Sequence, residues 1–103
     1  AGPGAFEAWA AHQRERIAQR FRGALQAEVA RHESAGAWRD ALAGLQRLIH
    51  DDGLHERHYR DAMRVHARLG EREAALQLFE RLRRLLGREL GLRPMPETVA
   101  LAE

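Results

Sequence analysis

The strongest constraint in this sequence is the absence of proline from residue 5 to residue 93. The three prolines of the 103-residue chain, Pro3, Pro94 and Pro96, all lie near its ends. The stretch between them is rich in Ala, Leu, Glu, Gln and Arg and poor in β-branched residues. Because those side chains lose little conformational entropy in a helix, the sequence predicts an all-α fold.

Glycines and the spacing of apolar residues divide this stretch into helices. Apolar residues recur at steps of three, four and seven, which is the periodicity of an amphipathic helix. Glycine readily adopts the left-handed conformation at a helix C-terminus, and five glycines stand where helices are expected to end: Gly36, Gly53, Gly70, Gly87 and Gly91. We expect a short C-terminal helix that begins at Pro96, preceded by four main helices over about 5–33, 37–50, 54–69 and 71–86.

The sequence also repeats itself at an offset of 34 residues. The matching pairs include Gly36 with Gly70, Ala41 with Ala75 and Leu48 with Leu82. A period of 34 is that of the tetratricopeptide repeat, in which small alanines let paired helices approach closely. We therefore expect tetratricopeptide-like stacked helix hairpins in a single domain over 1–103, with helical caps at both ends and repeats at about 22–55 and 56–89.

Composition limits the partners and the compartment of the chain. It contains no Cys, which excludes disulfides and thiolate metal sites and permits a reducing, intracellular setting. All 17 basic residues are Arg, but the net charge of +2 argues against strong non-specific affinity for nucleic-acid phosphates. No apolar run approaches the ~20 residues of a membrane span. We expect a cytoplasmic protein that itself binds neither nucleic acid nor a membrane.

No group of residues has the pattern of a catalytic site, and we do not expect an enzyme. Ser34 and Thr98 both stand near expected helix ends, where local capping is their expected role. Three nearby histidines could in principle hold Zn²⁺: His50, His55 and His58. Arg57 beside them disfavours a cation, so we expect surface histidines and neither a metal nor another cofactor. His66 falls on an inward helix face and is expected to be a hydrogen-bonded core residue.

Four arginines form a stripe on the expected helix over 54–69: Arg57, Arg60, Arg64 and Arg68. Asp61 lies within this arginine stripe and partly neutralises it. A solvated helix face is one interpretation. In the other, the first helix of each repeat lines the concave surface, and the guanidinium groups bind the carboxylates of a partner. The stripe is our candidate partner-binding site.

Two aromatic residues near the N-terminus, Phe6 and Trp9, have little surrounding sequence to cover them. The expected cover is the C-terminal helix, through Val99 and Leu101. The alternative is a second copy of the chain, which makes Phe6 and Trp9 candidate self-association residues.

The C-terminal part of the chain carries a specific motif. It reads Glu-Leu-Gly at 89–91, then Pro94, then Pro-Glu-Thr at 96–98. Together with the turn at 52–56, Asp-Gly-Leu-His-Glu, this motif resembles the bacterial transcriptional activator domain, the tetratricopeptide-like module of Streptomyces antibiotic regulatory protein-type regulators. The resemblance covers residues 4 to 103. The chain departs from the family at Gly53, where the family prefers Pro.

The resemblance implies a role in transcription control. In such regulators a winged-helix DNA-binding domain usually precedes this module, so the chain is expected to be a fragment of a larger regulator. It would mediate dimerisation or relay a signal to that domain, and its implied partners are the DNA-binding domain, a second copy and RNA polymerase. A free-standing repeat adaptor that binds acidic peptides through an arginine-lined groove is the alternative, and a small helical nucleic-acid binder is another.

Overall fold

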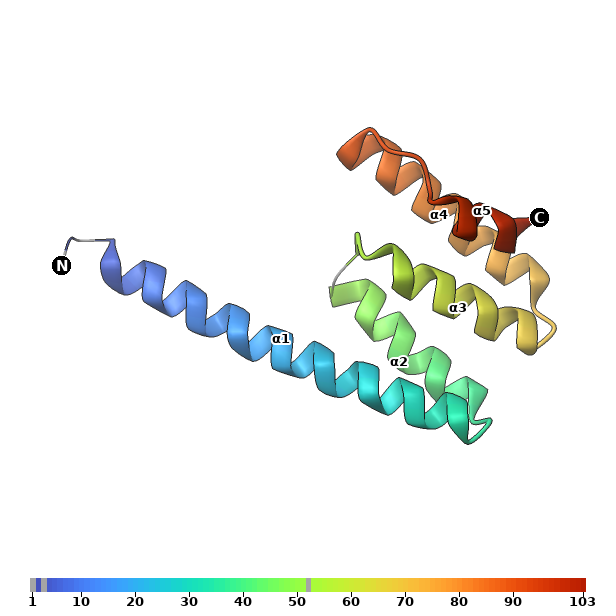
Figure 1. The fold of residues 1–103 in the computed structure, drawn as a ribbon, viewed down its shortest axis with the longest axis horizontal. Coiled ribbons are helices and arrows are strands. Elements are labelled where there is room, and N and C mark those ends of the chain that lie inside the picture. The colour runs from blue at the N-terminus through green and yellow to red at the C-terminus, as the bar shows by residue number, and fades with distance from the viewer. Residues whose placement is uncertain (1, 3, 52) are drawn as a thin grey trace.

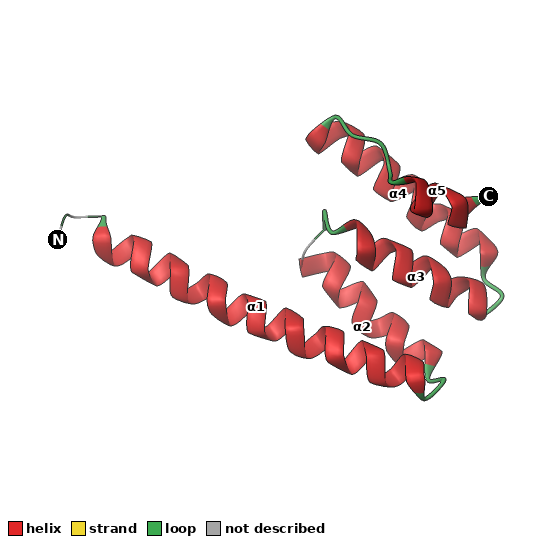
Figure 2. Ribbon diagram, viewed as in Figure 1, coloured by secondary structure: helices red, strands yellow, loops and turns green. Residues whose placement is uncertain are grey.

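The computed structural model describes residues 2, 4–51 and 53–103, and in this part of the chain it contains helices and no strand (Figures 1 and 2). The helices, in chain order, are α1 (Ala5–Ser34), α2 (Trp38–Asp51), α3 (Glu56–Arg68), α4 (Arg72–Leu90) and α5 (Pro96–Ala102). The predicted all-α, tetratricopeptide-like fold is confirmed, with four main helices and a short C-terminal helix that begins at Pro96.

Glycines end three of these elements. Gly36, Gly70 and Gly91 have φ of 71°, 75° and 63°, a conformation that costs other residues steric strain. The expected end of the fourth helix at residue 86 is wrong, because Gly87 lies inside α4 and the helix continues to Leu90. The chain then turns at Gly91, whose N–H donates to the Gly87 carbonyl at 3.2 Å. Asp52, which begins the family-like turn, lies outside the described residues.

The helices pair with their neighbours along the chain. The second half of α1 packs on α2, α2 packs on α3, and α3 packs on α4, so that α1–α2 and α3–α4 form two hairpins (Figure 1). Helix α5 contacts α3 and α4. Apolar side chains from the first four helices fill the core, among them Leu25, Leu45, Leu48, Tyr59, Val65 and Leu82. Ala41 and Ala75, which the 34-residue offset matches, are both buried.

The first half of α1 projects away from this packed body (Figure 1). Phe6 and Trp9 on this half are 72% and 59% exposed. The expectation that the C-terminal helix covers them is wrong, because α5 contacts only α3 and α4 among the described helices. Within the described residues, these two side chains therefore remain largely uncovered.

The α1–α2 hairpin depends on a close approach at Gly44 of α2. A Cβ added there would lie 2.6 Å from Cγ2 of Val29 on α1. Val29 is β-branched and nearly fully buried, so it cannot rotate freely to make room. The two helices can lie this close only because residue 44 has no side chain.

Gly44→Ala is expected to destabilise the protein although alanine is the better helix former. The added methyl overpacks the α1–α2 contact, at a cost of about 1–3 kcal/mol. Gly23→Ala is the matched control, because an added Cβ at Gly23 meets nothing within 4 Å. That change should stabilise α1 by up to about 1 kcal/mol. Urea unfolding followed by circular dichroism measures both, and equal stabilisation by the two changes would contradict the close packing at Gly44.

Candidate functional site

Arg57 and Arg64 of the arginine stripe lie on either side of Asp61 on α3. Nη1 of Arg64 is 2.9 Å from Oδ1 of Asp61, and Nε of Arg57 is 3.8 Å from Oδ2. Both arginine side chains are exposed. Asp61 thus neutralises part of the stripe, as the helical spacing predicted.

A second carboxylate, that of Glu33 on α1, belongs to the same surface. Glu33, Arg57 and Asp61 line a small cavity of about 80 Å³ between α1 and α3. Burial raises the pKa of Glu33 above its ordinary value, and the negative charge of Asp61 raises it further. Arg64 and Arg57 act in the opposite direction. The surface between α1 and α3 therefore carries charges of both signs at close range.

Arg60 has an internal position that the spacing did not predict. Its side chain is only 14% exposed, and Nη1 lies 3.4 Å from Oγ1 of Thr98 and 3.6 Å from Sδ of Met95. The same atom is 4.0 Å from the carboxylates of Glu56 and Glu97. Arg60 thus lies between α3 and the start of α5 and contributes to their packing.

Glu56, at the start of α3, holds α5 in place. Oε2 of Glu56 accepts a hydrogen bond from the Thr98 hydroxyl at 2.5 Å and another from the Met95 N–H at 2.7 Å. Thr98 is fully buried. Its predicted role as a local helix cap is wrong, because its hydroxyl donates to a residue of another helix. The Pro-Glu-Thr motif and the turn at 52–56 thus supply the two partners of one contact, Thr98 and Glu56.

Thr98→Val keeps the shape of the side chain but removes its hydroxyl. We expect this change to destabilise the protein by about 1–3 kcal/mol, because it leaves the Glu56 carboxylate short of one donor. Thr98→Ser retains the hydroxyl and should lose less stability. Thermal unfolding gives the stability, and limited proteolysis of the segment between α4 and α5 reports whether α5 detaches. If Thr98→Val is as stable and as resistant to protease as Thr98→Ser, the hydrogen bond to Glu56 does not hold α5.

Arg68, the last arginine of the stripe, contacts α2. Its Cζ lies 5.2 Å from the centre of the Trp38 ring, within range of a cation–π interaction. The side chain of Arg68 remains exposed. Of the four stripe arginines, Arg57, Arg64 and Arg68 are therefore accessible to a partner.

His66 forms part of a polar link between three segments of the chain. It is 9% exposed, and its Nδ1 lies 2.9 Å from Oε1 of Glu71, just before α4. The Nη2 of Arg39 on α2 donates to the other oxygen of Glu71 at 2.6 Å. Hydrogen bonds from Arg39 and His66 hold the pKa of Glu71 below its ordinary value, and the bond from Arg39 has the larger effect. The prediction of a hydrogen-bonded core histidine is confirmed.

The coupling between Arg39 and Glu71 should depend on pH. A depressed pKa means that this carboxylate contributes its full stability above its ordinary pKa and loses it as the pH falls through the folded-state value. A double-mutant cycle with Arg39→Gln and Glu71→Gln should give a favourable coupling at pH 7 and none near pH 2. Thermal unfolding of the four proteins at both pH values measures it. A coupling that persists unchanged in acid would rule out the ionised pair.

The three histidines considered as possible metal ligands, His50, His55 and His58, do not form a cluster. The rings of His55 and His58 stack with centres 4.4 Å apart, whereas His50 lines a cavity between α2 and α4. The expectation of surface histidines is wrong for His58, which is 2% exposed. Within the described residues, no group of three or more His, Cys, Asp or Glu side chains has the arrangement of a metal site.

Apolar residues extend from the packed half of α1 onto its projecting half as far as Ile17. Leu25 and Val29 are buried against the core, and Phe21 and Ile17 continue the series at steps of four. Ile17 is 65% exposed, and Phe21 lies under the guanidinium of Arg47 at 5.1 Å. Further out, the rings of Phe6 and Trp9 are 6.0 Å apart. We call residues 5–21 the projecting half of α1.

The described helices thus form paired hairpins, with exposed apolar side chains on α1 and exposed arginines on α3. The family model of the bacterial transcriptional activator domain matches residues 2–103, and the chain belongs to this family. The resemblance inferred from the C-terminal motif is confirmed, and with it a place in transcription regulation. No curated protein and no solved structure matches the chain. None of the described helices is both long enough and apolar enough to cross a membrane.

Proposed function

We propose that this chain is the protein-interaction module of a larger bacterial transcription regulator, where it mediates dimerisation or relays a signal to a DNA-binding domain. Membership of the activator-domain family supports the regulatory role. The observation that carries the interaction role is the uncovered apolar face on the projecting half of α1. We further propose that the two repeats span about 22–55 and 56–89, that the regulator acts in the cytoplasm and that the module has no catalytic activity.

The projecting half of α1 receives little stability from tertiary packing, because most of its residues are exposed. A helix of this length without tertiary contacts is marginal in water. Phe6, Trp9 and Ile17 each keep more than half of their surface exposed. Fully burying one such side chain stabilises a protein by about 1.5–3 kcal/mol. A partner that packs on this face gains that energy and also fixes the helix.

The partner that fits this face best is a protein domain or a second copy of the chain. The face is apolar and continues the surface that already packs on α2, so a helix or sheet with an apolar face can extend the same packing. A DNA-binding domain that precedes the module, as in related regulators, enters at the N-terminal end of α1, which is the projecting end (Figure 1). Such a domain would be covalently held near the face it covers.

Trp9→Glu tests whether the projecting half of α1 is a self-association surface. We expect the wild-type chain to form dimers in sedimentation experiments and Trp9→Glu to shift them to monomer, because a carboxylate cannot be buried there without a partner. Ala11→Glu is the control: it introduces the same charge two residues along, on the opposite side of the helix.

A dimer that survives Trp9→Glu would rule out this face as the dimer interface. A wild-type monomer would contradict dimerisation through this chain. The same pair of variants in the full-length regulator then distinguishes the remaining role, because only Trp9→Glu should change protease sensitivity between the DNA-binding domain and this module.

The second candidate function is a repeat adaptor that binds an acidic partner through the arginine stripe. We propose Arg57, Arg64 and Arg68 as its accessible contacts, with Arg60 in support from beneath α5. Guanidinium groups suit the bidentate binding of carboxylates. This candidate has weaker support than the first, because Asp61 and Glu33 already offset much of the positive charge.

A further inference from the structure

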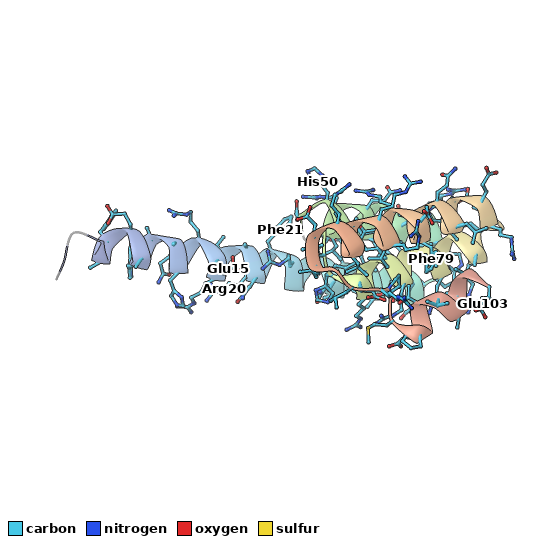
Figure 3. All side chains as sticks on the ribbon, turned by 90° about the horizontal axis from the view of Figure 1, so that it is seen from above. Glu15, Arg20, Phe21, His50, Phe79 and Glu103 are labelled. Carbon is cyan, nitrogen blue, oxygen red and sulfur yellow. The ribbon has the colours of Figure 1, made fainter. Side chains whose placement is uncertain are left out.

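A groove lies between α2 and α4, and α3 forms its floor. Its volume is about 680 Å³, and it is lined by Ile49 and His50 of α2, Tyr59 of α3 and a row of α4 residues. Figure 3 shows His50 on the edge of the helical body opposite to the edge occupied by α5, where Glu103 is labelled. The groove therefore opens on the side of the molecule away from α5. We call it the outer groove.

The floor of the outer groove contains an unused hydrogen-bond donor. Tyr59 is fully buried, and within the described residues its hydroxyl has no hydrogen-bond partner. A buried polar group without a partner destabilises a protein, so buried hydroxyls nearly always have one. Tyr59 is also one of the residues that line the groove, so its buried hydroxyl lies just beneath the groove surface.

The α4 wall of the groove is positively charged. Arg81, Arg84 and Arg88 recur at steps of three and four on one helix face, against a single glutamate, Glu80. The carboxylate of Glu80 accepts hydrogen bonds from Arg83, which hold its pKa below the ordinary value, and lies 3.4 Å from Nε of Arg84. Arg81 makes no ion pair with any described residue. Arg88 in turn lies 3.7 Å from the carboxylate of Glu89, so Arg81 is the wall arginine whose charge no described carboxylate offsets directly.

The shape of the groove favours a peptide over a small anion. A second hollow of about 240 Å³ shares Ile49, His50 and Arg81 with the first and extends along α2 and α4 to Leu78. The two hollows together form an elongated groove with a mixed polar and apolar lining and an arginine wall. A small anion needs only one end of it, whereas an extended or helical segment can follow its length. The net charge of +2 argues against a nucleic acid as the occupant.

We propose that the outer groove binds an acidic peptide segment of a partner protein, with one carboxylate accepting a hydrogen bond from the Tyr59 hydroxyl and ion pairs from Arg81 and Arg84. This surface is separate from the projecting half of α1. A regulator can therefore use α1 for its own assembly and the outer groove for a second protein. The two proposed roles can therefore be tested separately, with variants of one surface at a time.

The first test separates a binding role of Tyr59 from a structural one. Tyr59→Phe removes only the hydroxyl. Because that hydroxyl has no partner within the described chain, the variant should melt at the same temperature as the wild type or higher. A melting temperature several degrees lower would show that the hydroxyl already has a structural partner and would overturn the proposal.

The second test measures binding of a fluorescein-labelled hexaglutamate peptide by anisotropy at low salt, where ion pairs are least screened. We expect the wild type to bind. A charge-assisted hydrogen bond contributes about a factor of ten or more to affinity, so Tyr59→Phe should weaken binding about tenfold and Arg81→Gln with Arg84→Gln at least as much. Arg31→Gln with Arg93→Gln removes two equal charges from exposed positions outside both the groove and the α3 stripe and should leave the affinity within about twofold.

The following results would contradict the proposal. If the wild type does not bind the peptide, or if the groove variant loses no more affinity than the control with Arg31→Gln and Arg93→Gln, the acidic peptide does not occupy the outer groove. Inorganic phosphate and a labelled DNA duplex serve as competitors. If either displaces the peptide more effectively than unlabelled hexaglutamate does, the groove is a phosphate site and the peptide assignment is overturned. Circular dichroism of each variant confirms that it is folded.

Discussion

Helix α3 packs against α2, α4 and α5 at once, and the positions of these three helices depend on it. Six of its thirteen residues are buried, including Tyr59, Ala62 and Val65 in the centre of the core. Ala62 lets a neighbouring helix approach closely, while Tyr59 fills space between helices. A change that displaces α3 therefore alters its interfaces with α2, α4 and α5, whereas the α1–α2 and α4–α5 contacts do not involve it directly. It also reshapes both candidate binding surfaces, since the stripe arginines and the floor of the outer groove lie on its opposite faces.

Polar contacts fix the two ends of α3, where apolar packing alone would allow sliding. At its first residue, Glu56 accepts hydrogen bonds from Met95 and Thr98 and so positions α5. Near its last turn, His66 contacts Glu71, and Glu71 in turn binds Arg39 of α2. Hydrogen bonds of this kind contribute modest net stability, but breaking one leaves a buried group without a partner. Their main effect is to select one arrangement of helices that many apolar faces could otherwise adopt.

Much of the fold follows from local sequence rules, whereas the roles of single polar residues do not. The lack of proline predicted helices, and Gly36, Gly70 and Gly91 end or follow helices as expected. Gly87 was misassigned because a glycine in a helix costs only about 1 kcal/mol, which neighbouring leucines outweigh. Periodicity also placed Arg60 on the stripe correctly, but it could not reveal that α5 covers that position. Such information resides in contacts between distant segments, such as that between Glu56 and Thr98, which local sequence rules do not describe.

The continuity of α1 gives the molecule a mechanical property. A helix of 30 residues is about 45 Å long, and its outer half acts as a lever arm whose pivot is the packed half. A sideways force at Trp9 is transmitted as a torque to the contact between Val29 and Gly44, the place where the two helices have the least room to move. Gly23 stands where the arm leaves the body and is its most compliant point. A load applied at the tip is thus expected to bend the helix at residue 23 before it strains the core.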